Sequence, residues 1–374
     1  MNAKLADQQT GAEGVSEQDL LEEFVRHLEG ASSFSVAAER HYEVEFPALD
    51  GRQRLDALLR MDGNHDVWLA IEMKREAFPR DIKNALWQLD EYQRAVQGEK
   101  DVIPVVLAHN LSPGARELLR SQNVAYYDAS GSLFLRRGDV VIDIDRPAAP
   151  APRSRSGSLF AGAREQVIHA LLNARGEWVT GKDLAEQAKT SGFTVSQTLS
   201  ELERMEWVKT DGGGRTARRR LEQPGALLDA WAAAWKERAE ARSRWFAFSA
   251  NPRVLPDSIA EKLLAADEAH WCISGAVAGN ALAPLLTSVD VVDLIVAPGR
   301  ARSVAAAAGA KPAVKGANLV IVERSGASDL FRRSMPDHPA PLASPFIVYL
   351  DLLKDARGRN QELASQLRSA VLKV

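Results

Sequence analysis

The stretch from residue 145 to residue 157 constrains the fold of this chain more than any other feature. It is rich in proline, alanine, serine and arginine, and its apolar residues follow no helical or strand period. Proline fixes φ and lacks a backbone donor, so this composition is typical of an extended linker. A chain of 374 residues is also too long for one ordinary core. We therefore predict a domain at residues 1–146, a linker at 147–158 and further domains beyond it.

Charge changes along the chain at the same place. Residues 1–146 hold 17 basic and 26 acidic side chains, a balance of −9, whereas residues 147–220 hold 12 and 8, a balance of +4. The net charge of −3 for the whole chain conceals this division. An acidic first part and a basic middle part indicate surfaces for different partners.

Cysteine content and hydropathy limit the cellular setting. Cys272 is the single cysteine, which excludes an internal disulfide and a cysteine-based zinc site. Together with the absence of a secretory signal pattern, this predicts a cytoplasmic location. The longest apolar runs, such as residues 102–108, have the length of a strand, so we expect no membrane partner.

The pattern before the linker is that of an α/β layer domain. Two strands flank a turn at residues 62–65, whose Asp-Gly-Asn-His sequence favours a hairpin. The helices predicted from amphipathic spacing and from proline near the first turn alternate with strands. The predicted helices are 16–28, 79–96 and 112–121, and the predicted strands are 53–61, 67–73, 102–108, 124–128 and β structure over 133–145.

Three chemically useful side chains lie on the two strands of this hairpin. Asp56 belongs to the first strand, and Glu72 and Lys74, two residues apart, belong to the second. Alternate residues of a strand point to one face, so Glu72 and Lys74 share a face. Asp56 and Glu72 could together hold a divalent metal such as Mg²⁺, which would polarise a phosphate and activate water. Lys74 could stabilise charge on the phosphoryl oxygens.

With this pattern, residues 16–145 resemble the PD-(D/E)xK restriction endonuclease-like superfamily. Gln88 and Tyr92 on the following helix are similar to the Gln-x-x-x-Tyr element of RecB-type nucleases. The resemblance implies that Gln88 lies beside a catalytic site of Asp56, Glu72 and Lys74. It also implies that Glu22 or Glu23 adds an acid to the metal site. The alternative is a scaffold without cleavage, in which Glu72 and Lys74 form a surface ion pair.

Three predicted helices and a hairpin follow the linker. The helices are expected at residues 160–174, at 181–189 after a Thr180 cap, and at 192–207. Val195, Leu199 and Leu202 recur at helical spacing in the third helix and are expected to face inward. A glycine-rich turn with a basic return strand completes residues 207–221.

Residues 159–223 resemble the winged helix-turn-helix family, in which the third helix enters the major groove of duplex DNA. The resemblance places Thr194, Ser196, Gln197 and Ser200 near base edges, where glutamine can pair with adenine and serine with several bases. The hairpin would contact phosphates or the minor groove, giving affinity rather than sequence choice. The alternative is a winged helix that binds proteins. The basic residues expected to contact DNA in the hairpin are Lys209, Arg215, Arg218, Arg219 and Arg220.

The tail, residues 224–374, begins with a predicted helix over 227–244 that contains Trp231 and Trp235 at helical spacing. Helices and strands then alternate at 270–279, 288–297, 318–323 and 346–353, which indicates a C-terminal α+β domain. From residue 160 to the C-terminus, the winged helix, tryptophan helix, Ser-Gly-Ala-Val-Ala segment and closing Tyr-Leu-Asp-Leu-Leu segment resemble the AbiEi family. Its bacterial members are antitoxins of type IV toxin–antitoxin systems that also repress their own promoter.

The sequence therefore predicts a multi-domain α/β protein that binds double-stranded DNA as an antitoxin-like transcriptional regulator. The alternative is a Mg²⁺- or Mn²⁺-dependent DNA endonuclease that is targeted by the winged helix. A cognate toxin is an expected partner from the family resemblance. A homodimer is expected because winged-helix regulators often bind two half-sites.

Overall fold

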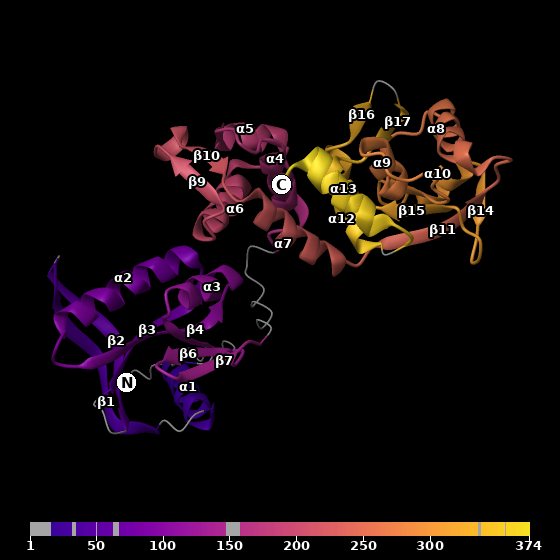
Figure 1. The fold of residues 1–374 in the computed structure, drawn as a ribbon. Coiled ribbons are helices and arrows are strands. Elements are labelled where there is room, and N and C mark those ends of the chain that lie inside the picture. Colours follow the sequence, from indigo (N-terminus) through magenta and orange to yellow (C-terminus); the bar gives the residue numbers. More distant parts are fainter. Residues whose placement is uncertain are drawn as a thin grey trace, which may run out of the picture. The chain divides into compact units, whose positions relative to one another are not determined.

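A computed structural model describes residues 16–31, 35–49, 51–62, 67–146, 158–335, 338–355 and 357–374, except for the side chains of residues 38, 215 and 339. The chain forms two compact units, Met1–Arg155 and Ser156–Val374 (Figure 1). The division falls within the predicted linker, of which residues 147–157 lie outside the described part. No helix in the described ranges is both long enough and apolar enough to cross a membrane.

The first unit is built on one mixed seven-stranded sheet in the order β1-β2-β3-β4-β5-β6-β7. Strands β3, β4 and β5 are parallel to one another, and the other neighbouring pairs are antiparallel. Its elements are α1 (Glu17–Ala31), β1 (Ser35–Ala48), β2 (Gly51–Asp62), β3 (Val67–Ala77), α2 (Pro79–Ala95), β4 (Asp101–Leu111), α3 (Pro113–Ser121), β5 (Ala125–Asp128), β6 (Leu133–Arg137) and β7 (Val140–Ile144).

Helices cover both faces of this sheet, so the unit has three layers (Figure 1). On β3, Leu69 and Ile71 pack into the core beneath α1, while Trp68 and Ala70 pack into the core beneath α2 and α3. This alternation is the period of two that a strand imposes. The prediction of an α/β layer domain is confirmed, and the predicted β structure at 133–145 consists of two strands.

Local capping explains where two of the helices begin. At α2, the backbone N–H of Phe78 donates to the Asp81 carboxylate at 3.0 Å, and Pro79 occupies the first turn. At α3, Ser112 Oγ accepts from the N–H of Ala115 at 3.2 Å. Both arrangements satisfy donors that a helix leaves unpaired at its amino end.

The second unit begins with three helices and a small antiparallel sheet in the order β8-β10-β9. Thr180 caps α5 through the N–H of Asp183, and Ser191 caps α6 through the N–H of Thr194. The elements are α4 (Gly162–Asn173), β8 (Val179–Thr180), α5 (Gly181–Gln187), α6 (Gly192–Arg204), β9 (Val208–Asp211), a 3₁₀ turn (Gly214–Thr216) and β10 (Arg218–Leu221).

Helix α6 ends at Arg204, three residues before the predicted end at Trp207. Glu206 adopts a positive φ of 59°, a left-handed conformation that cannot continue a right-handed helix. The N–H of Trp207 then donates to the carbonyl of Leu202 at 3.0 Å. The chain thereby turns directly from α6 into β9.

The tail is a second mixed seven-stranded sheet, in the order β14-β11-β15-β13-β12-β17-β16, with helices packed against it. Pairs β13–β15 and β12–β17 are parallel. Its elements are α7 (Pro224–Lys236), β11 (Ala241–Ala247), a 3₁₀ turn (Pro252–Val254), α8 (Leu255–Ala265), β12 (Trp271–Ser274), α9 (Gly275–Leu282), β13 (Val292–Val296), α10 (Ala301–Ala307), β14 (Ala310–Pro312), β15 (Leu319–Glu323), α11 (Ala327–Leu330), β16 (Arg333–Met335), β17 (His338–Leu342), α12 (Pro345–Lys354), α13 (Asn360–Leu367) and a π-helical turn (Arg368–Leu372).

The predicted helix over residues 227–244 is wrong in its last eight residues. Helix α7 ends at Lys236, and residues 241–244 belong to strand β11. These four residues pair with β15, and the later residues of the strand, Trp245–Ala247, pair with β14. Strand pairing outweighs the weak local preference for helix in this segment.

One continuous hydrophobic core runs through the second unit. It joins Val167 and Leu171 of α4 to Trp231 and Trp235 of α7 and to the helices of the tail. Both tryptophans are buried, which agrees with α7 acting as a helix that joins parts of the core. Residues 159–223 and 224–374 therefore share a core within one compact unit.

Candidate nucleic-acid interface and candidate metal centre

Helix α6 has a buried face and a polar exposed face. Val195, Leu199 and Leu202 are buried, whereas Ser196, Gln197 and Ser200 are exposed and Thr194 is partly exposed. The helical period places these two sets on opposite sides. The structure thus brings all four predicted base-contacting residues to the outer side of one helix. Phe193, which precedes Thr194, is 74% exposed. It is not among the residues predicted to contact DNA.

The arginines of the β9–β10 hairpin have acidic partners within the protein. Arg218 pairs with Asp211 at 2.9 Å and Arg219 with Glu203 at 3.2 Å. Each pair reduces the positive charge that the sequence assigned to the hairpin.

Arg220 is also compensated, whereas Lys209 is not. Arg220 pairs with Glu222 at 2.7 Å and lies over the Trp178 ring, 5.0 Å from its centroid. Lys209 is exposed, and within the described part of the chain it forms no ion pair. The side chain of Arg215 lies outside the described residues. Among the hairpin cations whose side chains are described, Lys209 is therefore the one without an acidic partner.

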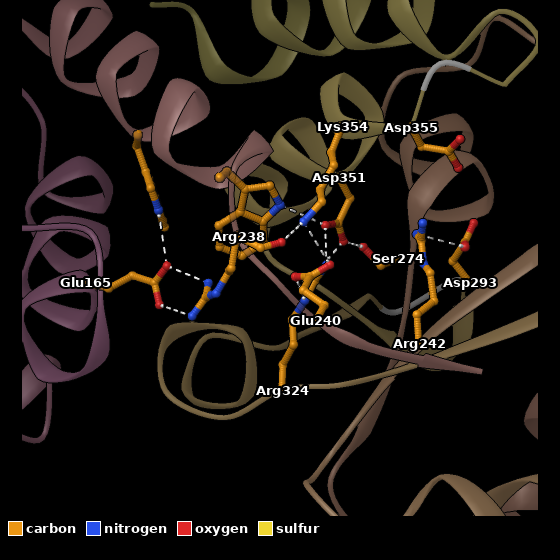
Figure 2. A network of polar contacts seen from close by, with 12 residues as sticks. Glu165, Arg238, Glu240, Arg242, Ser274, Asp293, Arg324, Asp351, Lys354 and Asp355 are labelled. Atoms are coloured by element: carbon orange, nitrogen blue, oxygen red, sulfur yellow. Dashed lines mark hydrogen bonds and ion pairs between the residues drawn. The ribbon is translucent and has the colours of Figure 1, made fainter. Parts of the chain in front are cut away.

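A buried network of charged groups joins α4 to the tail (Figure 2). Glu165 of α4 is 1% exposed and accepts hydrogen bonds from Arg238, at 2.9 and 3.3 Å, and from Trp231 Nε1 at 3.2 Å. Burial raises the pKa of Glu165, and the Arg238 guanidinium acts in the opposite direction. Such a carboxylate is stable inside a protein only when it is paired and hydrogen-bonded.

Asp351 of α12 is the second acidic centre of the network. Its carboxylate accepts from Trp235 Nε1 at 3.1 Å and from Ser274 Oγ at 2.6 Å, and it pairs with Arg324 at 2.7 Å. Burial alone would raise the pKa of Asp351, but the Arg324 guanidinium and these hydrogen bonds hold it below its usual value. Glu240 pairs with Arg324 at 2.7 Å on the other side. The sequence hint was a single acid inside the apolar run of α12.

The carboxylates predicted for the metal site lie on neighbouring strands of the first unit. The N–H of Met73 donates to Asp56 Oδ2 at 2.6 Å, and Lys74 Nζ lies 2.9 Å from Glu72 Oε2. Glu72 is 1% exposed. Burial raises the pKa of Glu72 to about 7, with a smaller contribution from the negative charge of Asp56. The structure thus brings Asp56, Glu72 and Lys74 together.

One oxygen of this site lacks a partner among the described residues. Glu72 Oε1 is buried and accepts no hydrogen bond from that part of the chain, an arrangement that usually requires an explanation. A divalent cation beside Oε1 would supply the missing interaction, and Mg²⁺ commonly uses one or two carboxylates and keeps several waters. Within the described ranges, no group of three or more Asp, Glu, His or Cys side chains has a metal-binding arrangement. Asp56 and Glu72 therefore fit a metal site with two carboxylate ligands.

The surroundings of the site agree only in part with the predicted positions. Gln88 of α2 donates from Nε2 to the carbonyl of Arg54 at 2.8 Å, close in sequence to Asp56. Glu22 instead pairs with Arg40, and the acid of α1 that lines the cleft beside Asp56 is Glu17. This cleft has a volume of about 410 Å³ and also contains Tyr42 and Glu43. Sequence spacing could not identify these two acids, because Glu43 reaches the site through the long-range pairing of β1 with β2 and Glu17 through the tertiary position of α1.

Cys272 of β12 is completely buried, and burial raises the pKa of its thiol to about 12. A thiol of this kind is protonated at neutral pH and chemically inert. The prediction that Cys272 packs as a small apolar residue agrees with this environment.

The second unit thus combines a three-helix segment and an α/β tail around one core. Buried ion pairs link the two parts. Residues 220–373 match the sequence model of the family described as "Transcriptional regulator, AbiEi antitoxin, Type IV TA system". The predicted resemblance of the tail to that family is confirmed. The match begins at Arg220, at the end of the hairpin, so it does not include α4, α5 and α6.

The chain is also similar to two solved endonuclease structures. One is described as the "crystal structure of a repair endonuclease from Pyrococcus abyssi", with 17% identity, 34% of this chain and 49% of that chain covered, and a TM-score of 0.23. The other is the "Structure of EndoMS-dsDNA2 complex", with 18% identity, 33% and 48% covered, and a TM-score of 0.24. The chain spans about half the length of these structures, and similarities of this size assign no activity. No curated protein matches the sequence.

Proposed function

We propose that this protein is a DNA-binding transcriptional regulator of the antitoxin type. In this proposal α4, α5, α6 and the β9–β10 hairpin form a winged helix-turn-helix. The observation that carries the proposal is the outer face of α6, where Ser196, Gln197 and Ser200 are exposed while the opposite face is buried. The family match of the tail supports a regulatory role. Regulation of transcription places the protein in the cytoplasm with its DNA.

The exposed residues divide into two groups with different roles. Gln197 would pair with adenine, and Thr194, Ser196 and Ser200 would bond to neighbouring base edges. Lys209 and the hairpin arginines would contact phosphates, which positions the protein without selecting a sequence. Because Arg218, Arg219 and Arg220 already have acidic partners, Lys209 provides the cleaner test of the hairpin.

Selection of duplexes from a random-sequence pool tests the proposal. We expect the full chain to enrich a defined sequence, and Gln197→Ala to lose the preference at one position. We expect Lys209→Gln to weaken all duplexes uniformly and to reduce the slope of log affinity against log salt by about 1. Lys311→Gln, an exposed lysine of β14, is the matched control. Enrichment of no sequence by the wild-type protein would contradict sequence-specific binding.

A metal-dependent DNA endonuclease is the second candidate, and the unpartnered Glu72 Oε1 favours it. When bound beside Asp56 and Glu72, a Mg²⁺ ion would polarise a phosphate and lower the pKa of a water. Lys74, at the open side of Glu72 with its side chain 29% exposed, would stabilise negative charge on the phosphate oxygens. Gln88 holds the backbone of β2 close to Asp56.

Incubation of the full chain with supercoiled plasmid and Mg²⁺ or Mn²⁺ tests this candidate. The nuclease proposal predicts nicking that disappears in Lys74→Ala and persists in Lys311→Ala. Nicking that is absent, or that is equal in both variants, would leave the first unit as a scaffold.

We further propose two macromolecular partners besides DNA. The antitoxin assignment implies a cognate toxin, and co-expression with the product of a neighbouring nucleotidyltransferase gene tests it: a complex that survives gel filtration is expected.

Recognition of two half-sites implies a homodimer, and light scattering should give twice the mass of the chain. A monomer bound to a single half-site would contradict the second proposal.

A further inference from the structure

A cavity of about 350 Å³ lies in the second unit where the end of α4 meets the tail. Arg175, just beyond α4, lines one side, and Arg332 and Arg333, between α11 and β17, line another. His169 of α4 and Ser344, the residue that caps α12, also line it. The volume falls within the range of small-molecule sites.

The charge of the cavity is positive and largely uncompensated. Arg332 pairs with Asp329 at 3.4 Å. In the described part of the chain, Arg175 and Arg333 have no acidic partner, and no Asp or Glu lines the cavity. Arg175 is held over the Phe346 ring, 5.6 Å from its centroid, and donates to the carbonyl of Leu172 at 3.3 Å. Two guanidinium groups are thus available to an anion.

His169 contributes no charge, because it is fully buried and stacked on Phe331 with 3.9 Å between ring centroids. Burial lowers the pKa of His169 to about 3, so the ring is neutral. The ring nitrogens lie within hydrogen-bond distance of two side chains, Nδ1 at 3.1 Å from Asn173 Nδ2 and Nε2 at 2.5 Å from Ser344 Oγ. These contacts fix the position of the ring at the wall of the cavity.

Ser344 adds a buried hydroxyl to the cavity. Its side-chain oxygen lies 2.5 Å from His169 Nε2 and accepts from the N–H of Ile347 at 3.3 Å. Ser344 is 4% exposed and lines the cavity. These two contacts hold the hydroxyl in a fixed position in the cavity wall.

We propose that this cavity binds a small phosphate monoester. Two uncompensated guanidinium groups match the two negative charges of a phosphate monoester better than the single charge of a carboxylate, and their planar donors suit its oxygens. The buried Ser344 hydroxyl also lines the cavity. This site is separate from the DNA-binding surface and does not depend on it. Since α4 carries both His169 of the cavity and Arg164, which pairs with Glu201 of α6, a bound ligand stabilises the helix that supports α6.

Titration calorimetry of the full chain in phosphate-free buffer tests the proposal. The probes are inorganic phosphate, ribose 5-phosphate and AMP, with adenosine as the uncharged comparison. We expect at least one phosphate probe to bind and adenosine not to bind. The probe that binds most tightly distinguishes free phosphate, a sugar phosphate and a nucleotide as the source.

Substitutions locate the binding. Arg333→Gln and Arg175→Gln should each weaken the binding probe by about tenfold, as expected for loss of one charge-assisted hydrogen bond. Arg302→Gln, an exposed arginine of α10 outside the cavity, should leave the affinity unchanged. Thermal unfolding of each variant verifies that the second unit is folded. Absence of binding by all three phosphates, or equal affinity in Arg333→Gln and Arg302→Gln, would overturn the proposal.

Discussion

At the scale of single residues, Glu72 is a buried carboxylate with little compensation for its charge. Among the described residues, Lys74 alone pairs with it, and one of its oxygens has no partner there. Burial therefore favours the neutral acid and raises its pKa from 4.5 to about 7. Because the unfolded chain releases this proton at a lower pH than the folded protein, the folded state loses stability as pH rises from about 4.5 to 7.

Replacement of this carboxyl group removes the effect. We expect the stability of Glu72→Gln relative to wild type to increase between pH 4.5 and pH 8 by about 3 kcal/mol, the equivalent of the pKa shift. Urea unfolding of the first unit at several pH values measures it. Addition of Mg²⁺ should reduce the difference at pH 8 if the metal binds Glu72. Parallel pH profiles for the two proteins would show that the pKa of Glu72 is not raised.

At the scale of elements, α6 was predictable and the hairpin beside it was not. The spacing of Val195, Leu199 and Leu202 is local, so it identified the buried face and, by exclusion, the exposed Gln197. The partners of Arg218 and Arg219 depend on the register of β9 against β10 and on the position of α6. Those are long-range features, and a count of charges along the chain could not reveal that Asp211 and Glu203 compensate the arginines.

The same dependence on long-range contacts explains the other differences between the predicted and the observed structure. The prediction of a helix over residues 241–244 is wrong because these residues pair with β15, which comes about 80 residues later in the chain. In the first unit the strand positions of Asp56, Glu72 and Lys74 were predictable from alternation. The acid from α1 was not, because Glu17 lies near Asp56 only through tertiary packing.

The amino end of α6 depends on Ser191. Its Oγ accepts from the N–H of Thr194 at 3.1 Å at an exposed position. Ser191→Ala should destabilise the second unit by about 1 kcal/mol, whereas Ser191→Asp, which retains a capping acceptor, should preserve stability. Thermal unfolding of the two variants measures the difference. Equal losses in both variants would indicate that the serine acts through something other than capping.

At the scale of the whole molecule, the chain is an acidic domain built on a seven-stranded sheet, followed by a unit in which the candidate DNA-binding helices and the antitoxin-like tail share a core. The network from Glu165 to Asp351 (Figure 2) ties α4, α7 and α12 together through Arg238 and Arg324. Shared burial and ion pairs of this kind predict that the second unit unfolds as one cooperative body.

Removal of one partner tests this unity. Arg238→Ala leaves Glu165 buried with Trp231 as its one remaining donor among the described residues, and should destabilise the second unit by about 2 kcal/mol, since Arg238 itself is partly exposed. Hydrogen exchange should show α4, α6 and the tail opening together, and the first unit should be unaffected. Earlier exchange of α4 and α6 than of the tail would show two independent bodies.

The proposed function requires that the outer face of α6 contacts DNA. Fluorescence anisotropy with a duplex selected by the wild-type protein tests it most directly, through Gln197→Glu and the matched control Gln366→Glu on the exposed face of α13. Each variant adds one negative charge at an exposed position. We predict that Gln197→Glu weakens binding by at least about tenfold, through repulsion from the DNA and loss of a base contact, while Gln366→Glu binds as the wild type does. Equal affinities for the two variants would show that this face of α6 does not contact DNA.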